Sequence, residues 1–340
     1  MLSIITLVII VWILHIGQSL IIPFIIAILL SIFILSLAHF FERFPITRKL
    51  PMTLSVITYM ALIYGVISLI SSNAFSISDN FPTYAANFDK LYHNIFLAFG
   101  YTDPPATLDA IIQSTAKNID IKDLFTNTAN GIVNALSNVV LIFFYVIFIL
   151  IEGNHVNAKL NKALRGKNHY ANTVKTITQV QNEIKSYFFY KTLMSLATGV
   201  LSYVVMMAFG LDYASFWALL IFMLNFIPNI GSIIGVAFPV LLSIVQFTSA
   251  VQMVAMGILL ISVQFMIGNF IEPRYMSSRL NLSPLLIILC LTFWGALWGV
   301  AGMLLSVPIM VVLNIILCRF KSTRGIAIML SEKGDINNLK

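Results

Sequence analysis

Apolar runs that approach or reach the length of a membrane-spanning helix alternate along this chain with short polar segments. Six such runs occupy residues 2–17, 20–41, 53–71, 132–151, 187–209 and 250–271. The hydrocarbon core of a bilayer is about 30 Å thick, and an α-helix needs about 20 apolar residues to cross it. The pattern therefore predicts an all-α polytopic membrane protein with about six spanning helices.

Residues 212–246 depart from this pattern, because polar and helix-breaking residues interrupt an apolar stretch near its middle. The interruption contains Asn225, Pro228, Asn229 and Gly231. A helix over residues 213–226 would rise only about 21 Å, which is too short to cross the membrane. We expect a broken, re-entrant hairpin that enters the membrane and returns. Its tip indicates a polar path, since backbone groups at that depth need protein or water as partners.

A second interrupted block covers residues 282–317, with Gly295, Gly299, Gly302 and Pro308 at the interruptions. Two full crossings and a hairpin would both return the chain to the side from which it came. About 36 residues are few for two spans and a turn, so the length favours a second re-entrant hairpin.

Charged residues predict the side of the membrane on which each loop lies. Basic residues gather at 42–50, between 159 and 191, and from 319 to 324, and the positive-inside rule places these segments in the cytoplasm with both termini. The lysines of a helical connector at 155–186 are expected to be solvated or to lie on lipid headgroups.

Residues 72–131 hold six aspartates and three lysines, which favours the outer side, and their apolar spacing predicts short amphipathic helices. The net charge of +7 follows from this topology and indicates no nucleic-acid partner.

These boundaries divide the chain into six segments. They are the first three spans (1–71), an extracytoplasmic amphipathic segment (72–131), the fourth span with its connector (132–186), a first span and hairpin (187–247), a second span and hairpin (248–320), and a cytoplasmic tail (321–340).

The two span-and-hairpin segments form an inverted repeat, because the first hairpin is entered from outside and the second from inside. Four residues of the first segment recur 68 or 69 positions later: Leu211 as Leu280, Phe226 as Trp294, Gly231 as Gly299, and Pro239 as Pro308. Inverted repeats with broken helices are frequent in secondary transporters, where two related halves exchange conformations.

Five short motifs carry a resemblance to a known family: NFIPNIGS at 225–232, NFIEPR at 269–274, LSPL at 282–285, FWG at 293–295 and GMLLSVP at 302–308. With these motifs the chain resembles the AI-2E family of bacterial permeases, whose members include proteins described as autoinducer-2 exporters. The likeness extends over the whole length and layout of the chain. It implies a homo-oligomeric inner-membrane permease that exports a small solute. It does not fix the solute, because members have been linked to the autoinducer and to sodium.

The candidates for a transport path come from the two hairpins. They are Asn225, Pro228, Asn229, Gly231, Ser232, Trp294, Gly295, Gly299 and Ser306. The amides of Asn225 and Asn229 can donate and accept hydrogen bonds, as a hydroxylated solute or an ion requires. The tryptophans and glycines equally fit a packing role.

The candidates for ion coupling are Glu272, Arg274, Asn269 and Asp212. Carboxylates inside a membrane are costly and typical of proton relays, so we hypothesise that Glu272 carries a proton. Alternatively, Glu272 forms an ion pair with Arg274 or Arg279 that fixes the end of the helix. Asp212 alternatively caps a helix that begins near residue 215.

Catalytic and cofactor chemistry is not predicted. The histidines are scattered, Cys290 and Cys318 lie in apolar segments, and the HExxH, GxxxxGK[ST] and GxSxG motifs do not occur. The sequence therefore predicts a secondary transporter, not an enzyme, with no metal or cofactor. Its partners would be the lipid bilayer, a small solute, and a proton or sodium as coupling ion. The alternatives are a sodium/proton antiporter and a membrane scaffold that transports nothing.

Overall fold

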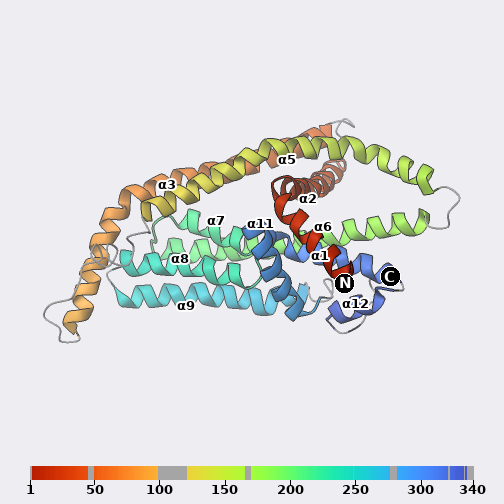
Figure 1. Ribbon diagram of the computed structural model, residues 1–340. Coiled ribbons are helices and arrows are strands. Elements are labelled where there is room, and N and C mark those ends of the chain that lie inside the picture. Colours follow the sequence, from red (N-terminus) through yellow and green to blue (C-terminus); the bar gives the residue numbers. More distant parts are fainter. Residues whose placement is uncertain are drawn as a thin grey trace. The chain divides into compact units, whose positions relative to one another are not determined.

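The described part of the chain is helical, as expected for an all-α membrane protein. The computed structural model describes residues 2–44, 50–98, 121–164, 170–247, 249–275, 282–320, 322–332 and 334 (Figure 1). Its helices are α1 (Leu2–Ile16), α2 (Gln18–Phe41), α3 (Leu50–Ala98), α5 (Ile121–Leu164), α6 (Tyr170–Ala208), α7 (Ala214–Leu224), α8 (Ile230–Gln246), α9 (Ala250–Met266), the π-helix η1 (Ile267–Ile271), α11 (Pro284–Arg319) and α12 (Arg324–Leu330).

Five helical stretches in these residues are long and apolar enough to cross a membrane. They are Gln18–Phe41, Leu50–Asn73, Thr173–Ala208, Ala250–Tyr275 and Pro284–Arg319. The first four coincide with predicted spans, and the fifth is the second interrupted block. Of the other two predicted spans, one falls on the 15-residue α1 and one on α5, where the apolar stretch Val139–Gly153 has fewer than 18 residues. The chain is therefore a multi-pass membrane protein.

Three helices continue well beyond the apolar runs that predicted them. Short separate helices were expected in 72–131 and a separate connector in 155–186. Instead, α3 continues without a break to Ala98, α5 runs from Ile121 to Leu164, and α6 begins at Tyr170. Extending an existing helix by one residue costs far less than nucleating a new one, which favours these continuous helices. Residues 99–120 and 165–169 lie outside the described part.

The chain packs as two compact units. Unit 1 comprises residues 1–60, 137–193 and 272–340, and unit 2 comprises residues 61–136 and 194–271. In unit 1, α11 packs against α1, α2 and α12. In unit 2, α8 packs against α7 and α9, and the three helices lie side by side (Figure 1). The first hairpin therefore belongs to unit 2 and the second to unit 1.

The first hairpin consists of α7 and α8, which have 11 and 17 residues. The chain reverses between them through a turn in which Asn229 adopts a positive φ of 60°. Just after the turn, a Cβ atom on Gly231 would lie 1.7 Å from the carbonyl oxygen of Leu224. Only glycine permits the backbone to approach itself this closely, so Gly231 is a requirement of the turn.

The second hairpin lies inside α11, which is interrupted at Gly299 by a non-helical conformation (φ 61°, ψ −142°). A Cβ atom on Gly302 would lie 1.9 Å from the carbonyl oxygen of Trp294. These residues are eight positions apart, and a straight helix would separate them by about 12 Å along its axis. The helix is therefore folded back on itself at this point.

The tips of the two hairpins correspond in a different register from the one read in the sequence. Gly231 and Leu224 make the same close approach as Gly302 and Trp294, which lie 71 and 70 positions later. Gly299 corresponds by its positive φ to Asn229. The matches of Gly231 with Gly299 and of Phe226 with Trp294 are therefore replaced, because residue identity in apolar sequence carries less information than backbone conformation. Leu280 lies outside the described residues.

Replacing Gly302 or Gly231 by alanine is expected to disrupt the corresponding hairpin. The added Cβ would collide with a backbone carbonyl, which cannot rotate away as a side chain can. Overpacking of this kind costs about 1–3 kcal/mol or more, so the thermal unfolding midpoint of the purified protein should fall by several degrees. Gly65 in α3 has open space around it, and Gly65→Ala is the control, expected to leave stability unchanged or to raise it. Unchanged midpoints in both hairpin variants would contradict the folded-back tips.

Candidate functional site

Asn225 is the buried centre of a polar cluster in unit 2. It ends α7, and its side chain is 3% exposed. Its amide nitrogen donates to the Ser195 hydroxyl of α6 over 3.1 Å, and its amide oxygen accepts a hydrogen bond of 3.3 Å from Gln264 of α9. Asn225 therefore ties the tip of the first hairpin to two neighbouring helices.

The cluster has unused hydrogen-bonding capacity on Gln264. The Oε1 atom of Gln264 is buried and has no hydrogen-bond partner among the described residues. A buried acceptor without a partner costs about 1–3 kcal/mol, so it is a favourable place for a donor from a solute or water. Ser195 and Gln264 were not among the residues predicted from the sequence. Gln264 could have been found because it places an amide inside a predominantly apolar span.

The other polar residues of this tip differ from Asn225 in their surroundings. Asn229 is exposed and Pro228 is partly exposed. The Ser232 hydroxyl donates to the backbone carbonyl oxygen of Asn229 over 2.8 Å, which supports the turn. The structure thus brings these residues together at one tip but leaves the Asn229 amide free to meet a solute.

Asp212 lies at the open end of the first hairpin and does not cap α7. The helix begins after Tyr213, which has a φ of 57°, and no described side chain caps it. The Asp212 carboxylate instead accepts a 2.8 Å hydrogen bond from the Tyr84 hydroxyl of α3. Gln246 closes the base of the hairpin, because it accepts from the backbone N–H of Asp212 and donates to the carbonyl oxygen of Gly210, both over 2.8 Å.

Tyr84 is held in its neutral form at this open end. Burial and the adjacent Asp212 carboxylate both raise the pKa of the Tyr84 phenol above its ordinary value, because each disfavours the phenolate. The Asn80 amide, one turn earlier on α3, donates to the Tyr213 hydroxyl over 2.5 Å. The extension of α3 beyond its apolar run therefore holds the entrance of the first hairpin.

Glu272 forms an ion pair in unit 1 with a residue that the sequence analysis had not paired with it. Its carboxylate lies 2.5 Å from the ammonium group of Lys191, and the two side chains are 19% and 5% exposed. Arg274, the partner considered for it, is exposed, and Arg279 lies outside the described residues. The sequence itself marks Lys191 as unusual, because this residue lies inside the predicted span 187–209, where a charged side chain is costly.

The side chain of Asn269 interacts with its own helix and not with this ion pair. It is exposed, and its amide nitrogen donates locally to the carbonyl oxygen of Phe265 over 3.3 Å. It lies within η1, and π-helical turns frequently occur at functional sites. A coupling role for Asn269 stays a prediction.

The residues of the second hairpin are mostly engaged in packing. The rings of Trp294 and Trp298 are buried, with centroids 4.7 Å apart, and the Trp298 indole N–H donates to the Leu14 carbonyl oxygen over 3.0 Å. The buried Ser306 hydroxyl donates to the Met303 carbonyl oxygen. A Cβ on Gly295 would lie 2.9 Å from the Met303 side chain, whereas Gly299 is exposed. These contacts fit the packing alternative for the tryptophans and Gly295.

Comparison with known proteins places this architecture in a family. The model of the AI-2E family transporters matches residues 2–321. The AI-2 transport protein TqsA of Escherichia coli K12 is 30% identical over 328 residues, which cover 93% of this chain and 90% of TqsA. The YhhT protein of the same strain is 28% identical over 320 residues, 93% of this chain and 89% of YhhT. A Borreliella burgdorferi protein is 34% identical over 220 residues, which cover 64% of this chain and 60% of that protein.

The matched region contains both hairpins, the Asn225 cluster and the Lys191–Glu272 ion pair. An identity of 30% over nine-tenths of both chains, together with a family match over nearly the whole sequence, shows common descent. The chain belongs to the AI-2E transporter family.

Proposed function

We propose that this transporter exports a small hydrophilic solute of the autoinducer-2 class through the bacterial inner membrane by alternating access. The observation that carries the proposal is the pair of folded-back hairpins, whose tips need glycine; the first tip also holds the buried amide of Asn225 within apolar surroundings. Irregular backbone of this kind is tolerated in a membrane only where protein or a water-filled cavity satisfies it. The similarity to TqsA, an AI-2 transport protein, supports the substrate class, and such export would connect the chain to quorum sensing.

The tip of the first hairpin and the neighbouring helix α9 each offer a solute one kind of group. Asn229 presents an exposed amide, and the buried Gln264 oxygen is an acceptor without a described partner. A hydroxylated solute could hydrogen-bond with both an amide and an acceptor. Pro228, Gly231 and Ser232 act indirectly, because they shape the turn that presents Asn229.

The Lys191–Glu272 ion pair is the proposed coupling element. A buried pair is stable only while both charges stay together, because each charge alone would be poorly solvated. Protonation of Glu272 would remove its charge and release Lys191, and this change can bias a conformational equilibrium. Arg274 and Asp212 remain proposed accessory groups at exposed positions.

The same ion pair favours sodium/proton antiport as a second candidate function. A carboxylate released from Lys191 could accept sodium in place of a proton, without any organic solute. We further expect the transporter to act as a homo-oligomer, with both termini in the cytoplasm.

Replacing Asn229 by glycine should reduce autoinducer-2 efflux from proteoliposomes at least tenfold. Glycine keeps the positive φ of Asn229 without strain, so the variant removes the amide and preserves the turn. The unfolding midpoint should stay within about 2 °C of the parent. Gln252→Ala removes an exposed amide from α9 outside the hairpin and should transport normally. Normal efflux by Asn229→Gly would exclude the amide from the transport path.

The ion pair can be tested with a double-mutant cycle of Lys191→Gln and Glu272→Gln. Glu272→Gln leaves the buried Lys191 ammonium unpaired and should lose about 3 kcal/mol of stability, and Lys191→Gln leaves the partly buried Glu272 carboxylate unpaired and should lose less. The double variant should recover most of either loss. The folded double variant should transport without its normal dependence on pH, because the proposed coupling pair is gone. The exposed pair Lys159–Glu152 supplies a matched control cycle, with an expected coupling below about 1 kcal/mol.

Two results of this experiment would change the proposal. A double variant that transports with an unchanged pH profile would make the ion pair purely structural. Sodium-dependent proton movement by the parent protein, in the absence of any autoinducer-2 flux, would favour the antiporter.

Alternating access predicts that the tip of the first hairpin can be labelled from both sides of the membrane. Ile230 is 40% exposed, so Ile230→Cys in a background with Cys290→Ala and Cys318→Ala is a suitable probe. Gly231 is unsuitable, because any side chain there collides with Leu224. Impermeant maleimides should react from either side. Labelling from the cytoplasm alone would indicate an ordinary cytoplasmic loop and contradict the hairpin topology.

A further inference from the structure

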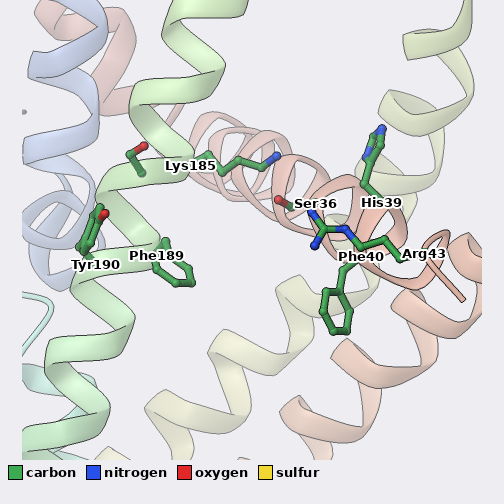
Figure 2. A pocket seen from close by; sticks show the side chains of 8 residues that line it. Ser36, His39, Phe40, Arg43, Lys185, Phe189 and Tyr190 are labelled. Atoms are coloured by element: carbon green, nitrogen blue, oxygen red, sulfur yellow. The ribbon is translucent and has the colours of Figure 1, made fainter.

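A cavity of about 350 Å³ lies in unit 1 between α2 and α6. It is lined by Ser36, His39, Phe40, Arg43, Lys185, Ser186, Phe189 and Tyr190 (Figure 2). Its volume falls within the range of about 300–1,000 Å³ that is usual for small-molecule sites. None of these residues belongs to the proposed transport path or to the coupling pair.

The lining comes from one face of each helix. The α2 residues Ser36, His39 and Phe40 are followed by Arg43 in the next turn, a spacing that places all four on one side. The α6 residues recur one turn apart in the same way. Two opposed stripes of this kind form a groove along the helices that can hold an elongated molecule.

The charge of the cavity is positive. Figure 2 shows the Lys185 ammonium and the Arg43 guanidinium both pointing toward Ser36. Neither cation belongs to an ion pair between described residues, and no carboxylate lines the cavity, although Glu42 and Glu183 are near in sequence. A guanidinium, an ammonium and a hydroxyl group together match the oxygens of a phosphate group.

The aromatic lining favours a lipid as the source of such a phosphate group. The rings of Phe40 and Phe189 are 49% and 62% exposed, so the cavity borders large apolar surfaces. The cations lie where the apolar run of α2 ends, which is the level of the lipid headgroups at the end of a span. In the proposed topology this is the cytoplasmic side, and basic pockets between helices on that side suit anionic headgroups.

We propose that this cavity binds the phosphate headgroup of an anionic phospholipid. Arg43 and Lys185 pair with the phosphate, Ser36 donates a hydrogen bond to it, and the acyl chains lie against Phe40 and Phe189. The bound lipid joins the end of α2 to α6 within unit 1.

The proposal can be tested on the full chain by native mass spectrometry with dioctanoyl-phosphatidylglycerol as the probe. The parent protein should bind this lipid at least tenfold more tightly than dioctanoyl-phosphatidylcholine. The double variant Arg43→Gln/Lys185→Gln should bind the anionic lipid at least tenfold more weakly than the parent. Lys162→Gln/Lys175→Gln removes the same charge from exposed positions of α5 and α6 and should bind like the parent.

A charge-conserving variant distinguishes loss of the site from loss of the fold. Arg43→Lys/Lys185→Arg keeps both cations and should retain binding within about threefold. Glycerol 3-phosphate tests the alternative source, a soluble phosphate, and should bind at least tenfold more weakly than the lipid. Equal binding of glycerol 3-phosphate, equal binding of the two lipids, or unchanged binding by Arg43→Gln/Lys185→Gln would each overturn the proposal.

Discussion

Close approach of the backbone to itself at two glycines is the constraint on which this structure depends. Gly231 and Gly302 each follow a chain reversal, and each lies where any side chain would collide with a carbonyl group of the preceding helix. The helices α7 and α8 have 11 and 17 residues, fewer than the about 20 that a membrane-spanning helix needs. The chain reversals therefore fold the interrupted apolar stretches into hairpins. Two glycines therefore convert interrupted runs into hairpins.

The polar groups near the hairpins follow from the same constraint. A chain reversal in apolar surroundings leaves backbone and side-chain groups that need partners. In unit 2, Asn225 bonds to Ser195 and Gln264 at the tip, while Gln246 closes the base. In unit 1, the Trp298 indole bonds to the Leu14 carbonyl oxygen near the second reversal. These ties hold each hairpin to its neighbours, so a hairpin can move only if its ties are exchanged.

Exchange of such ties is the physical basis of the proposed transport cycle. The Lys191–Glu272 ion pair is stable when both charges are present and becomes weak when one is neutralised. In the proposed cycle, a proton or a sodium ion would change the preferred arrangement of unit 1 without any covalent step. The Asn225 cluster has no ionisable group, so in the proposed cycle it would meet the solute, and the ion pair would meet the coupling ion.

The sequence by itself determined the class of protein, the positions of the spans and the two interruptions, because apolar length and helix-breaking residues act locally along the chain. It also identified Asn225, Asn229 and Glu272 as candidate functional residues. Only the tertiary structure decided their partners. Lys191 lies 81 positions from Glu272, and Ser195 lies 30 positions from Asn225, distances that no local pattern can bridge.

The register of the inverted repeat was likewise decided in three dimensions. Matching letters paired Gly231 with Gly299, but the two residues do different things: one permits close approach and the other adopts a positive φ. The same holds for Asp212, whose position before a helix favoured a cap, whereas its carboxylate accepts a hydrogen bond from Tyr84 on α3. A sequence records which residues could serve a role, and packing between distant segments selects the role that each one fills.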